Sequence, residues 1–238
     1  MSPTRVRSVD TNPVTHPTRL LRRPLSDADR FAKCAIVVTE LFSEHLDRGV
    51  PLLAKTTWVR FLPADLGPAR FPAVPALASL GLGEVHEVPY DRRVLDLPDD
   101  ERRRAILDWL RATMLALAAA LSWDAGPIEQ ACRACLSDGC RYRRTGPARS
   151  SPDRRRKAHA EYEIDGDGDA WSWIVVTDRA GVTQAVSDRW DSPPTTSGAR
   201  KVPRSVRWDG DTVTWTPWTD DVAPDGAART ARFRSGPR

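Results

Sequence analysis

The chain has 238 residues, of which 40% are hydrophobic and 29% are charged, and its net charge at pH 7 is +4. These proportions are typical of globular proteins and exclude a chain that is disordered along its whole length. Four cysteines in a chain of this length do not make a disulfide framework. The longest apolar run of the clearest helix, 114–121, is far shorter than the ~20 residues that span a bilayer, so we expect no membrane contact.

The first ten residues contain no apolar core of an export signal, and we therefore expect a cytoplasmic protein. Arginine dominates the 36 basic residues, because lysine occupies only four positions. Much arginine and alanine with little lysine indicates a GC-rich genome, which favours a bacterial origin. The places where the arginines cluster are thus more informative than their number.

Residues 1–25 are rich in proline, threonine, serine and arginine and show no periodicity. We interpret this segment as a disordered basic arm. A basic arm can bind phosphate, but most such arms are simply solvated.

The segment 26–140 is predicted to be a helix-rich α+β part. Its first helix spans 26–48, where apolar residues follow helical spacing. Ser26 is a suitable N-cap for this helix, and Gly49 is a suitable residue to end it.

Two strands are predicted within this part, over 53–62 and 83–90. Four prolines between them predict a loop, with one short helical turn near 76–80. Whether these strands share one sheet with the C-terminal part stays open at this point.

The clearest helix of the sequence spans 99–122, with acidic residues in its first turn. A second helix follows after Pro127, and together the two predict a helical hairpin over 99–138. The first of them carries an apolar stripe at intervals of three and four residues, formed by Ile106, Leu110, Met114, Leu117 and Leu121.

The segment 141–157 is strongly basic, and its Ser-Ser-Pro run at 150–152 indicates a linker between the two parts of the chain. If the chain binds nucleic acid, this segment is the predicted phosphate contact. The residues concerned are Arg141, Arg143, Arg144, Arg149, Arg154, Arg155, Arg156 and Lys157.

The segment 158–218 predicts an antiparallel β part. Hairpin turns rich in aspartate and glycine fall at 165–169, 178–181 and 209–211. A loop is expected over 192–198, and 219–238 is expected to be a disordered tail. The fold class is therefore α+β, with long amphipathic helices and a few strands in the N-terminal part and antiparallel β-hairpins in the C-terminal part.

Three closely spaced cysteines, Cys132, Cys135 and Cys140, are the one candidate metal site. His159 or Cys34 would supply a fourth zinc ligand, but structural zinc sites usually draw on two ligand pairs, and the second pair is missing. Packing in the core is the favoured interpretation. We therefore expect no metal and no other cofactor.

No catalytic motif is found in the sequence. The alternating acids at 165–169 resemble a calcium loop, but Ala170 and Val176 stand where that loop needs glycine and glutamate. Glu84, Glu87 and Asp91 would form an acidic site only if the fold brought them together. We therefore expect no enzyme and assign no catalytic residue.

Six of the nine tryptophans lie in the C-terminal part. Their favoured interpretation is an aromatic core for a small sheet, and the alternative is an exposed surface that grips a partner. Aromatic residues beside arginines also suit single-stranded nucleic acid. The candidate partner-binding residues are Trp171, Trp173, Trp208 and Trp215.

The leading functional hypothesis is a non-catalytic interaction or regulatory protein, such as an adaptor or an immunity or antitoxin-like protein, whose protein partner is not identified. The alternative is a nucleic-acid-binding protein that uses the arginines of 141–157.

Overall fold

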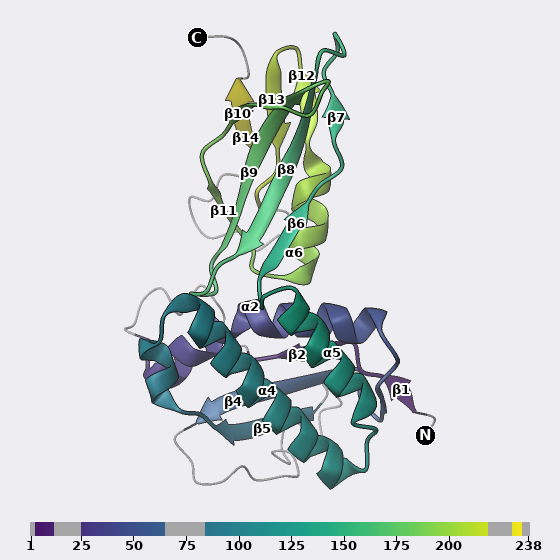
Figure 1. Cartoon of the computed structure of the whole chain (residues 1–238), viewed down its shortest axis with the longest axis vertical. Coiled ribbons are helices and arrows are strands. Elements are labelled where there is room, and N and C mark those ends of the chain that lie inside the picture. The colour runs from purple at the N-terminus through teal and green to yellow at the C-terminus, as the bar shows by residue number, and fades with distance from the viewer. Residues whose placement is uncertain (1–2, 12–24, 65–83, 219–229, 235–238) are drawn as a thin grey trace. The chain divides into compact units, whose positions relative to one another are not determined.

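The chain forms two compact units in the computed structural model, which describes residues 3–11, 25–64, 84–218 and 230–234 (Figure 1). The first unit comprises Met1–Tyr142 with the turn Gly166–Gly168, and the second comprises Arg143–Asp165 and Asp169–Arg238. Long helices dominate the first unit and antiparallel strands the second. The predicted α+β class is therefore confirmed.

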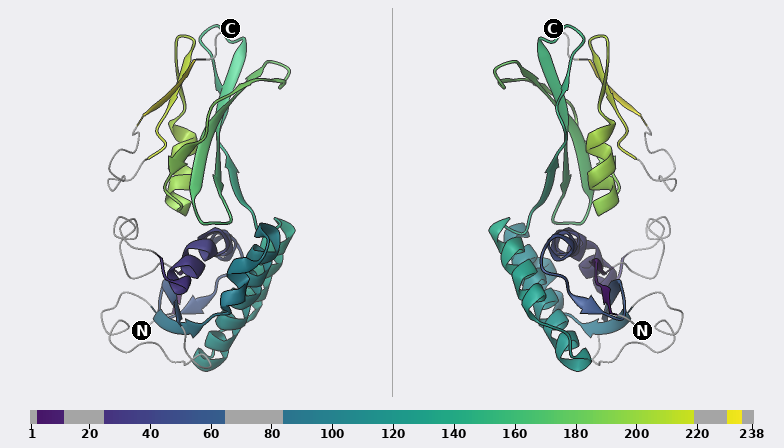
Figure 2. Two further views of the ribbon diagram at one scale, coloured as in Figure 1. Left: turned by 90° about the vertical axis from the view of Figure 1, so that its left-hand side faces the viewer. Right: turned by 90° about the vertical axis from the view of Figure 1, so that its right-hand side faces the viewer.

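A three-stranded parallel sheet forms one layer of the first unit. Its strands are β2 (Ser8–Asp10), β4 (Trp58–Ala64) and β5 (Glu84–Pro89), and β4 lies in the middle. Helix α2 (Asp27–Arg48) connects β2 to β4, as parallel pairing requires a crossover. Figures 1 and 2 show the helices of this unit on one side of the sheet.

Helix α2 begins and ends where the sequence predicts. The backbone N–H of Asp29 donates to Ser26 Oγ at 3.1 Å, and the N–H of Ser26 donates back to the Asp29 carboxylate at 3.4 Å, which makes a capping box. On its buried side, the ring of Phe31 lies 4.9 Å from that of Trp109. Phe61 of β4 lies 6.2 Å from the same indole, so α2 and the sheet share one core with Trp109.

Trp109 belongs to helix α4 (Asp99–Leu121), which is followed by helix α5 (Gly126–Ser137). Of the predicted stripe on α4, the first four residues are buried, and Leu121 is partly exposed. A short 3₁₀ helix, η1 (Arg92–Asp96), leads into α4, and the small pair β1 (Thr4–Arg5) and β3 (Leu53–Ala54) completes the unit.

The N-terminal residues 3–11 do not form the predicted disordered arm. Val6 and Val9 are buried: the N–H of Val6 donates to the Leu52 backbone oxygen at 2.9 Å, and Val9 of β2 pairs with Val59 of β4. The guanidinium of Arg5 donates to the carbonyl oxygens of Leu46 at 3.1 Å and Gly49 at 3.2 Å, at the C-terminal end of α2. Burial and capping therefore order this segment; the rest of the predicted arm lies outside the described residues.

The second unit contains two antiparallel sheets. The larger has the order β10-β9-β8-β6, with β11 also paired to β9 and β7 to β8, and the smaller has the order β12-β13-β14. The strands are β6 (Tyr142–Thr145), β7 (Arg149–Ser150), β8 (Arg156–Ile164), β9 (Ala170–Asp178), β10 (Thr183–Val186), β11 (Trp190–Ser192), β12 (Arg207–Asp209), β13 (Thr212–Trp215) and β14 (Ala231–Arg234).

The predicted hairpin turns are present in this unit. Gly181 and Gly210 adopt φ angles of +89° and +60°, a left-handed backbone that glycine accepts without strain. Tyr162, Ile174 and Trp215 are fully buried and form part of the core between the sheets. Helix α6 (Thr196–Lys201) and the 3₁₀ helix η2 (Val202–Ser205) form the connection from β11 to β12.

Three other predicted loops differ from the structure. The segment 141–157, expected to be a linker, contains β6, β7 and the start of β8, because its residues pair with the long β8–β9 hairpin. The expected loop 192–198 includes the start of α6, which the Thr195 side chain caps. Within the expected tail, β14 pairs with β13. The expected turn near 76–80 and the rest of the tail lie outside the described residues.

Candidate nucleic-acid interface

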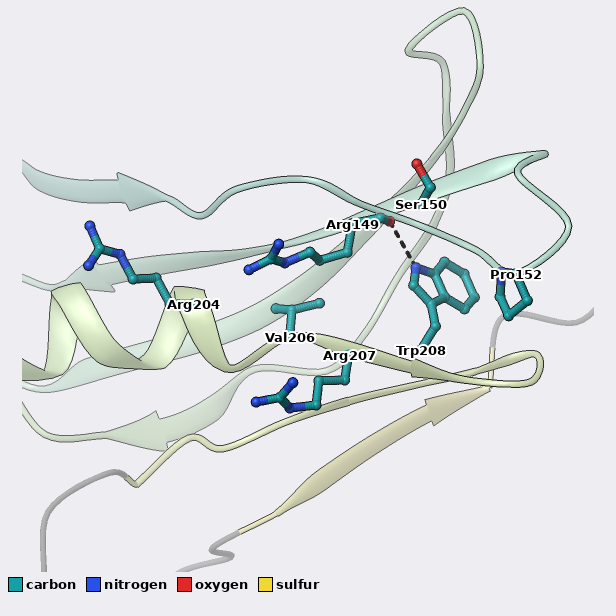
Figure 3. A pocket seen from close by; sticks show the side chains of 7 residues that line it. All are labelled: Arg149, Ser150, Pro152, Arg204, Val206, Arg207 and Trp208. Carbon is teal, nitrogen blue, oxygen red and sulfur yellow. Dashed lines mark hydrogen bonds between the residues drawn. The ribbon is translucent and has the colours of Figure 1, made fainter.

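A pocket of about 460 Å³ in the second unit gathers basic side chains (Figure 3). A volume in this range is typical of ligand sites. Figure 3 shows Arg149 and Arg207 extending in the same direction on either side of Val206, with Arg204 beyond them and Trp208 at the other end. The lining residues are Arg149, Ser150, Pro152, Arg204, Val206, Arg207 and Trp208.

Two separate segments build the walls of the pocket. Arg149 begins β7 of the larger sheet, whereas Arg204 lies in η2 and Arg207 begins β12 of the smaller sheet. A hydrogen bond joins the walls, because the indole Nε1 of Trp208 donates to the backbone oxygen of Arg149 at 2.8 Å. Val206 is buried at the floor between them.

The arginines of the pocket carry uncompensated charge. Among the residues that the structure describes, no carboxylate lies within 4.0 Å of the guanidinium of Arg149, Arg204 or Arg207. All three side chains are exposed. Three like charges around one concavity raise the local concentration of anions. The pocket therefore carries a local excess of positive charge.

Trp208 is held in a fixed orientation at one end of the pocket. Besides its hydrogen bond to Arg149, the guanidinium carbon of Arg156 lies 5.3 Å from the centre of its ring, within range of a cation–π contact. The indole is partly exposed and lines the pocket beside Pro152. It thus presents a rigid aromatic surface to a ligand.

The predicted basic segment divides into residues with different roles. Arg141 belongs to the first unit, where it pairs with Asp100 at 3.1 Å. Arg143 pairs with Glu163 at 3.4 Å, on the outer face of the larger sheet. Arg144 donates a hydrogen bond to the backbone oxygen of Arg143 at 2.7 Å.

The second half of that segment lies around the pocket. Arg149 is a lining residue and Arg156 lies over Trp208. The backbone oxygen of Arg154 accepts a hydrogen bond from Arg179, and the backbone N–H of Arg155 donates to Asp153. Lys157 is exposed on β8, opposite Thr177.

Sequence analysis missed Arg204 and Arg207, which complete the arginine set. Their spacing in Arg-Ser-Val-Arg-Trp is a weak signal, because nothing in the local sequence indicates that β12 lies beside β7. Trp208 of the same wall was predicted from the sequence as a candidate partner-binding residue.

The other candidate tryptophans lie elsewhere in the unit. Trp215 is 1% exposed in the core, so it is withdrawn from the candidate partner surface. Trp171 is partly exposed and donates from Nε1 to Asp165 at 2.8 Å, across the β8–β9 turn. That bond shows the acidic run of the turn engaged in hairpin contacts.

Trp173 lies beneath two arginines on the outer face of the larger sheet. The guanidinium carbons of Arg189 and Arg143 are 4.4 Å and 5.8 Å from the centre of its ring. Both guanidinium groups also reach one oxygen of Glu163, at 3.3 Å and 3.4 Å. Beside them, Thr145 donates to Glu161 at 3.0 Å. The two arginines cover the indole, which is buried at 8% exposure, so Trp173 is withdrawn as an exposed partner-binding residue. The exposed part of this surface is charged, and we call it the Trp173 face.

The cysteines are buried and free, and none forms a disulfide. In the described parts of the chain, no group of three or more His, Cys, Asp or Glu side chains is placed to hold a metal ion. Burial raises the pKa of Cys132 to about 12 and raises that of Cys135 as well. Their thiols are therefore protonated and packed in the core of the first unit.

The acidic residues that might have formed a catalytic centre do not converge. Glu84 and Glu87 lie an odd number of residues apart on β5 and so occupy opposite faces of the strand. Asp91 caps η1 and accepts hydrogen bonds from Arg93. We find no shared pocket for these carboxylates among the described residues.

The described helices include none with the length and apolar character needed to cross a membrane. In comparisons with known proteins, no family model, no curated protein and no solved structure matches this chain.

Proposed function

We propose that the chain is a non-catalytic binding protein whose second unit binds nucleic acid at the arginine pocket. The observation that carries the proposal is that Arg149, Arg204 and Arg207 line one pocket and that, among the described residues, no carboxylate lies within 4.0 Å of their guanidinium groups. A guanidinium matches the geometry of phosphate oxygens and forms two parallel hydrogen bonds with them. An array of three therefore favours a ligand with several phosphates.

The arrangement favours a nucleic acid over a single small anion. The arginines come from β7, η2 and β12, and they extend along the pocket instead of enclosing one point (Figure 3). An extended row of positive charge fits a chain of phosphates. Trp208 at its end offers contact to a base, which inorganic anions lack.

The test is a salt titration of binding to a labelled single-stranded oligonucleotide, followed by fluorescence anisotropy. Three phosphate contacts correspond to a slope of log affinity against log salt of about −2, at about −0.7 per contact. The double variant R204Q/R207Q removes two contacts, so we expect a slope of about −0.7 and a loss of binding of at least about tenfold at low salt.

A matched control distinguishes the effect of the pocket arginines from the effect of a change in net charge. Arg104 and Arg133 are exposed arginines of the first unit, and R104Q/R133Q changes the net charge of the chain by the same amount. We expect this variant to bind like the wild type. Equal losses in the two double variants, or no binding by the wild type even at low salt, would refute the proposal.

The Trp173 face supports a second candidate function, binding of a protein partner. Arginine is enriched at binding hot spots, and the exposed Arg143 and Arg189 are both held over the buried Trp173 ring. The ion pairs to Glu163 hold the two arginines in place, so little side-chain freedom is lost on binding.

Charge reversal at Arg189 tests this second candidate. R189E places a carboxylate beside Glu163 and should abolish recovery of a protein partner with the tagged chain, while the circular dichroism spectrum stays that of the wild type. R207E, on the pocket, serves as the control of equal charge change. A partner retained by R189E and by Trp173→Ala would exclude this face.

A further inference from the structure

We infer that the arginine pocket selects single-stranded nucleic acid and stacks one unpaired base on Trp208. The inference rests on the proposed function and adds the class of nucleic acid and the residue that recognises it. It depends on the fixed indole of Trp208, on the concave shape of the pocket and on the charge of the neighbouring hairpin turn.

Trp208 is oriented before any ligand binds. Its Nε1 donates to the Arg149 backbone oxygen at 2.8 Å, and Arg156 lies 5.3 Å from the ring centre. A side chain held in this way loses little freedom when a base stacks on it. Since every base has an aromatic face, such stacking is tolerant of sequence.

The same hydrogen bond couples the base site to the phosphate site. The backbone oxygen that accepts the Trp208 N–H belongs to Arg149, whose guanidinium extends toward the other end of the pocket (Figure 3). The indole is therefore held beside the backbone from which the Arg149 side chain starts, within reach of a neighbouring phosphate. A strand with its base on Trp208 reaches Arg149 on the same side of β12 and continues toward Arg204, while Arg207 lies on the other face of β12.

The pocket is an open depression and not a protruding element, which disfavours a duplex. Proteins read duplex DNA with a protruding helix or β-ribbon that enters a groove, whereas a pocket receives a group that protrudes from the ligand. Paired bases are stacked on their neighbours and do not offer a free face. An unpaired base does, as in most proteins that bind single strands.

The nearest protruding element carries the wrong charge for a groove. Strand β12 ends at Asp209, and the turn to β13 contains Gly210 and Asp211, whose carboxylate pairs with Arg234 at 3.2 Å. The carboxylate of Asp209, beside this turn, would be repelled by the phosphates that border a groove. The acidic tip and the basic pocket together leave a single strand as the ligand that fits.

The experiment compares four probes by anisotropy and competition at low salt: a single-stranded oligonucleotide, the same sequence as a duplex, inorganic polyphosphate and the labelled strand with abasic sites. We expect the single strand to bind at least about tenfold more tightly than the duplex or the abasic strand. Base stacking on one aromatic residue accounts for a change of this size.

Variants of Trp208 assign the effect to the indole. W208L should weaken binding of the single strand about tenfold and leave polyphosphate binding unchanged, whereas W208F should retain most of the preference for bases. W190L, which removes an exposed tryptophan of the same unit, is the matched control and should bind like the wild type. Thermal unfolding of each variant shows whether it is folded.

The outcomes distinguish this inference from the proposed function. Equal binding of single strand, duplex and abasic strand, all weakened by R204Q/R207Q, would overturn the inference and leave a nucleic-acid-binding pocket. Loss of base preference in W190L and not in W208L would also overturn it. Absence of binding to every probe would refute both.

Discussion

The indole Nε1 of Trp215 donates a hydrogen bond to the hydroxyl of Ser172, 3.2 Å away, between the two sheets of the second unit. Both residues are buried, at 1% and 0% exposure. The bond therefore satisfies a polar group that has no access to water, and it joins β13 of the smaller sheet to β9 of the larger.

Removing the acceptor should destabilise the second unit. Ser172→Ala leaves the buried indole N–H without this partner, which costs about 1–3 kcal/mol. Urea unfolding measures the loss. In a double-mutant cycle with Trp215→Phe, the cost of S172A should be smaller, because the indole donor is already gone. Part of the cost should remain, because the Ser192 hydroxyl also donates to Ser172 Oγ, at 2.9 Å. Additive effects of the two substitutions would contradict this account.

The free energy of unfolding should decrease as the pH is lowered, because of His86. Its side chain is 0% exposed on β5, and burial lowers its pKa from 6.5 to about 4, although a Glu84 oxygen lies 3.5 Å from Nε2. The folded chain therefore holds this residue neutral, while the unfolded chain takes up a proton near pH 6.5. Its contribution is fully present above pH 6.5 and is lost as the pH falls toward 4.

The size of the effect follows from the pKa difference. Between pH 7.5 and pH 5.0, His86 should reduce the free energy of unfolding by about 2 kcal/mol, at about 1.4 kcal/mol per pH unit below the unfolded pKa. Urea unfolding at both pH values measures it, and His86→Gln should shrink the difference by that amount. An unchanged difference in the variant would show that other groups are responsible.

Arg5 should stabilise the C-terminal end of α2. Its guanidinium donates to carbonyl oxygens there that have no partner within the helix, and it places positive charge at the negative end of the helix dipole. Arg5→Ala should reduce the free energy of unfolding by about 1 kcal/mol. Arg7→Ala, an exposed neighbour, should have less than half the effect. Equal effects would mean that net charge alone matters.

The thiols of the folded chain should react slowly. Because the pKa of Cys132 is raised to about 12, the thiolate fraction at pH 8 is about one in ten thousand. Dithiodipyridine should therefore modify all four cysteines rapidly in guanidinium chloride and at least about 100-fold more slowly in the native protein. Rapid release of pyridinethione from the native protein would show that the first unit opens often.

Elements with strong local signals were predictable from the sequence. Helix α4 follows from the spacing of Ile106, Leu110, Met114 and Leu117, and the capping box at Ser26 marks the start of α2. The aspartate-glycine turns likewise predicted the hairpins of the second unit. In each case the residues that determine the structure are near one another in the chain.

Elements that depend on distant partners were not predictable. β2 is three residues long and is stable because Val9 pairs with Val59 of β4 and is buried under α2. β14 forms because Phe233 faces Val213. The candidate site also depends on distant partners. Arg149 and Arg207 line one pocket only because β7 and β12 lie side by side, which neither local sequence predicts.

The two walls of the arginine pocket lie on short strands at the margins of their sheets, and its residues other than Val206 contribute little to the core. Substitution of Arg149, Arg204 or Arg207 should therefore leave the packing of the core unchanged. In evolutionary terms, this leaves the ligand preference of the second unit free to diverge quickly, one wall at a time, while Tyr162 and Trp215 preserve the scaffold.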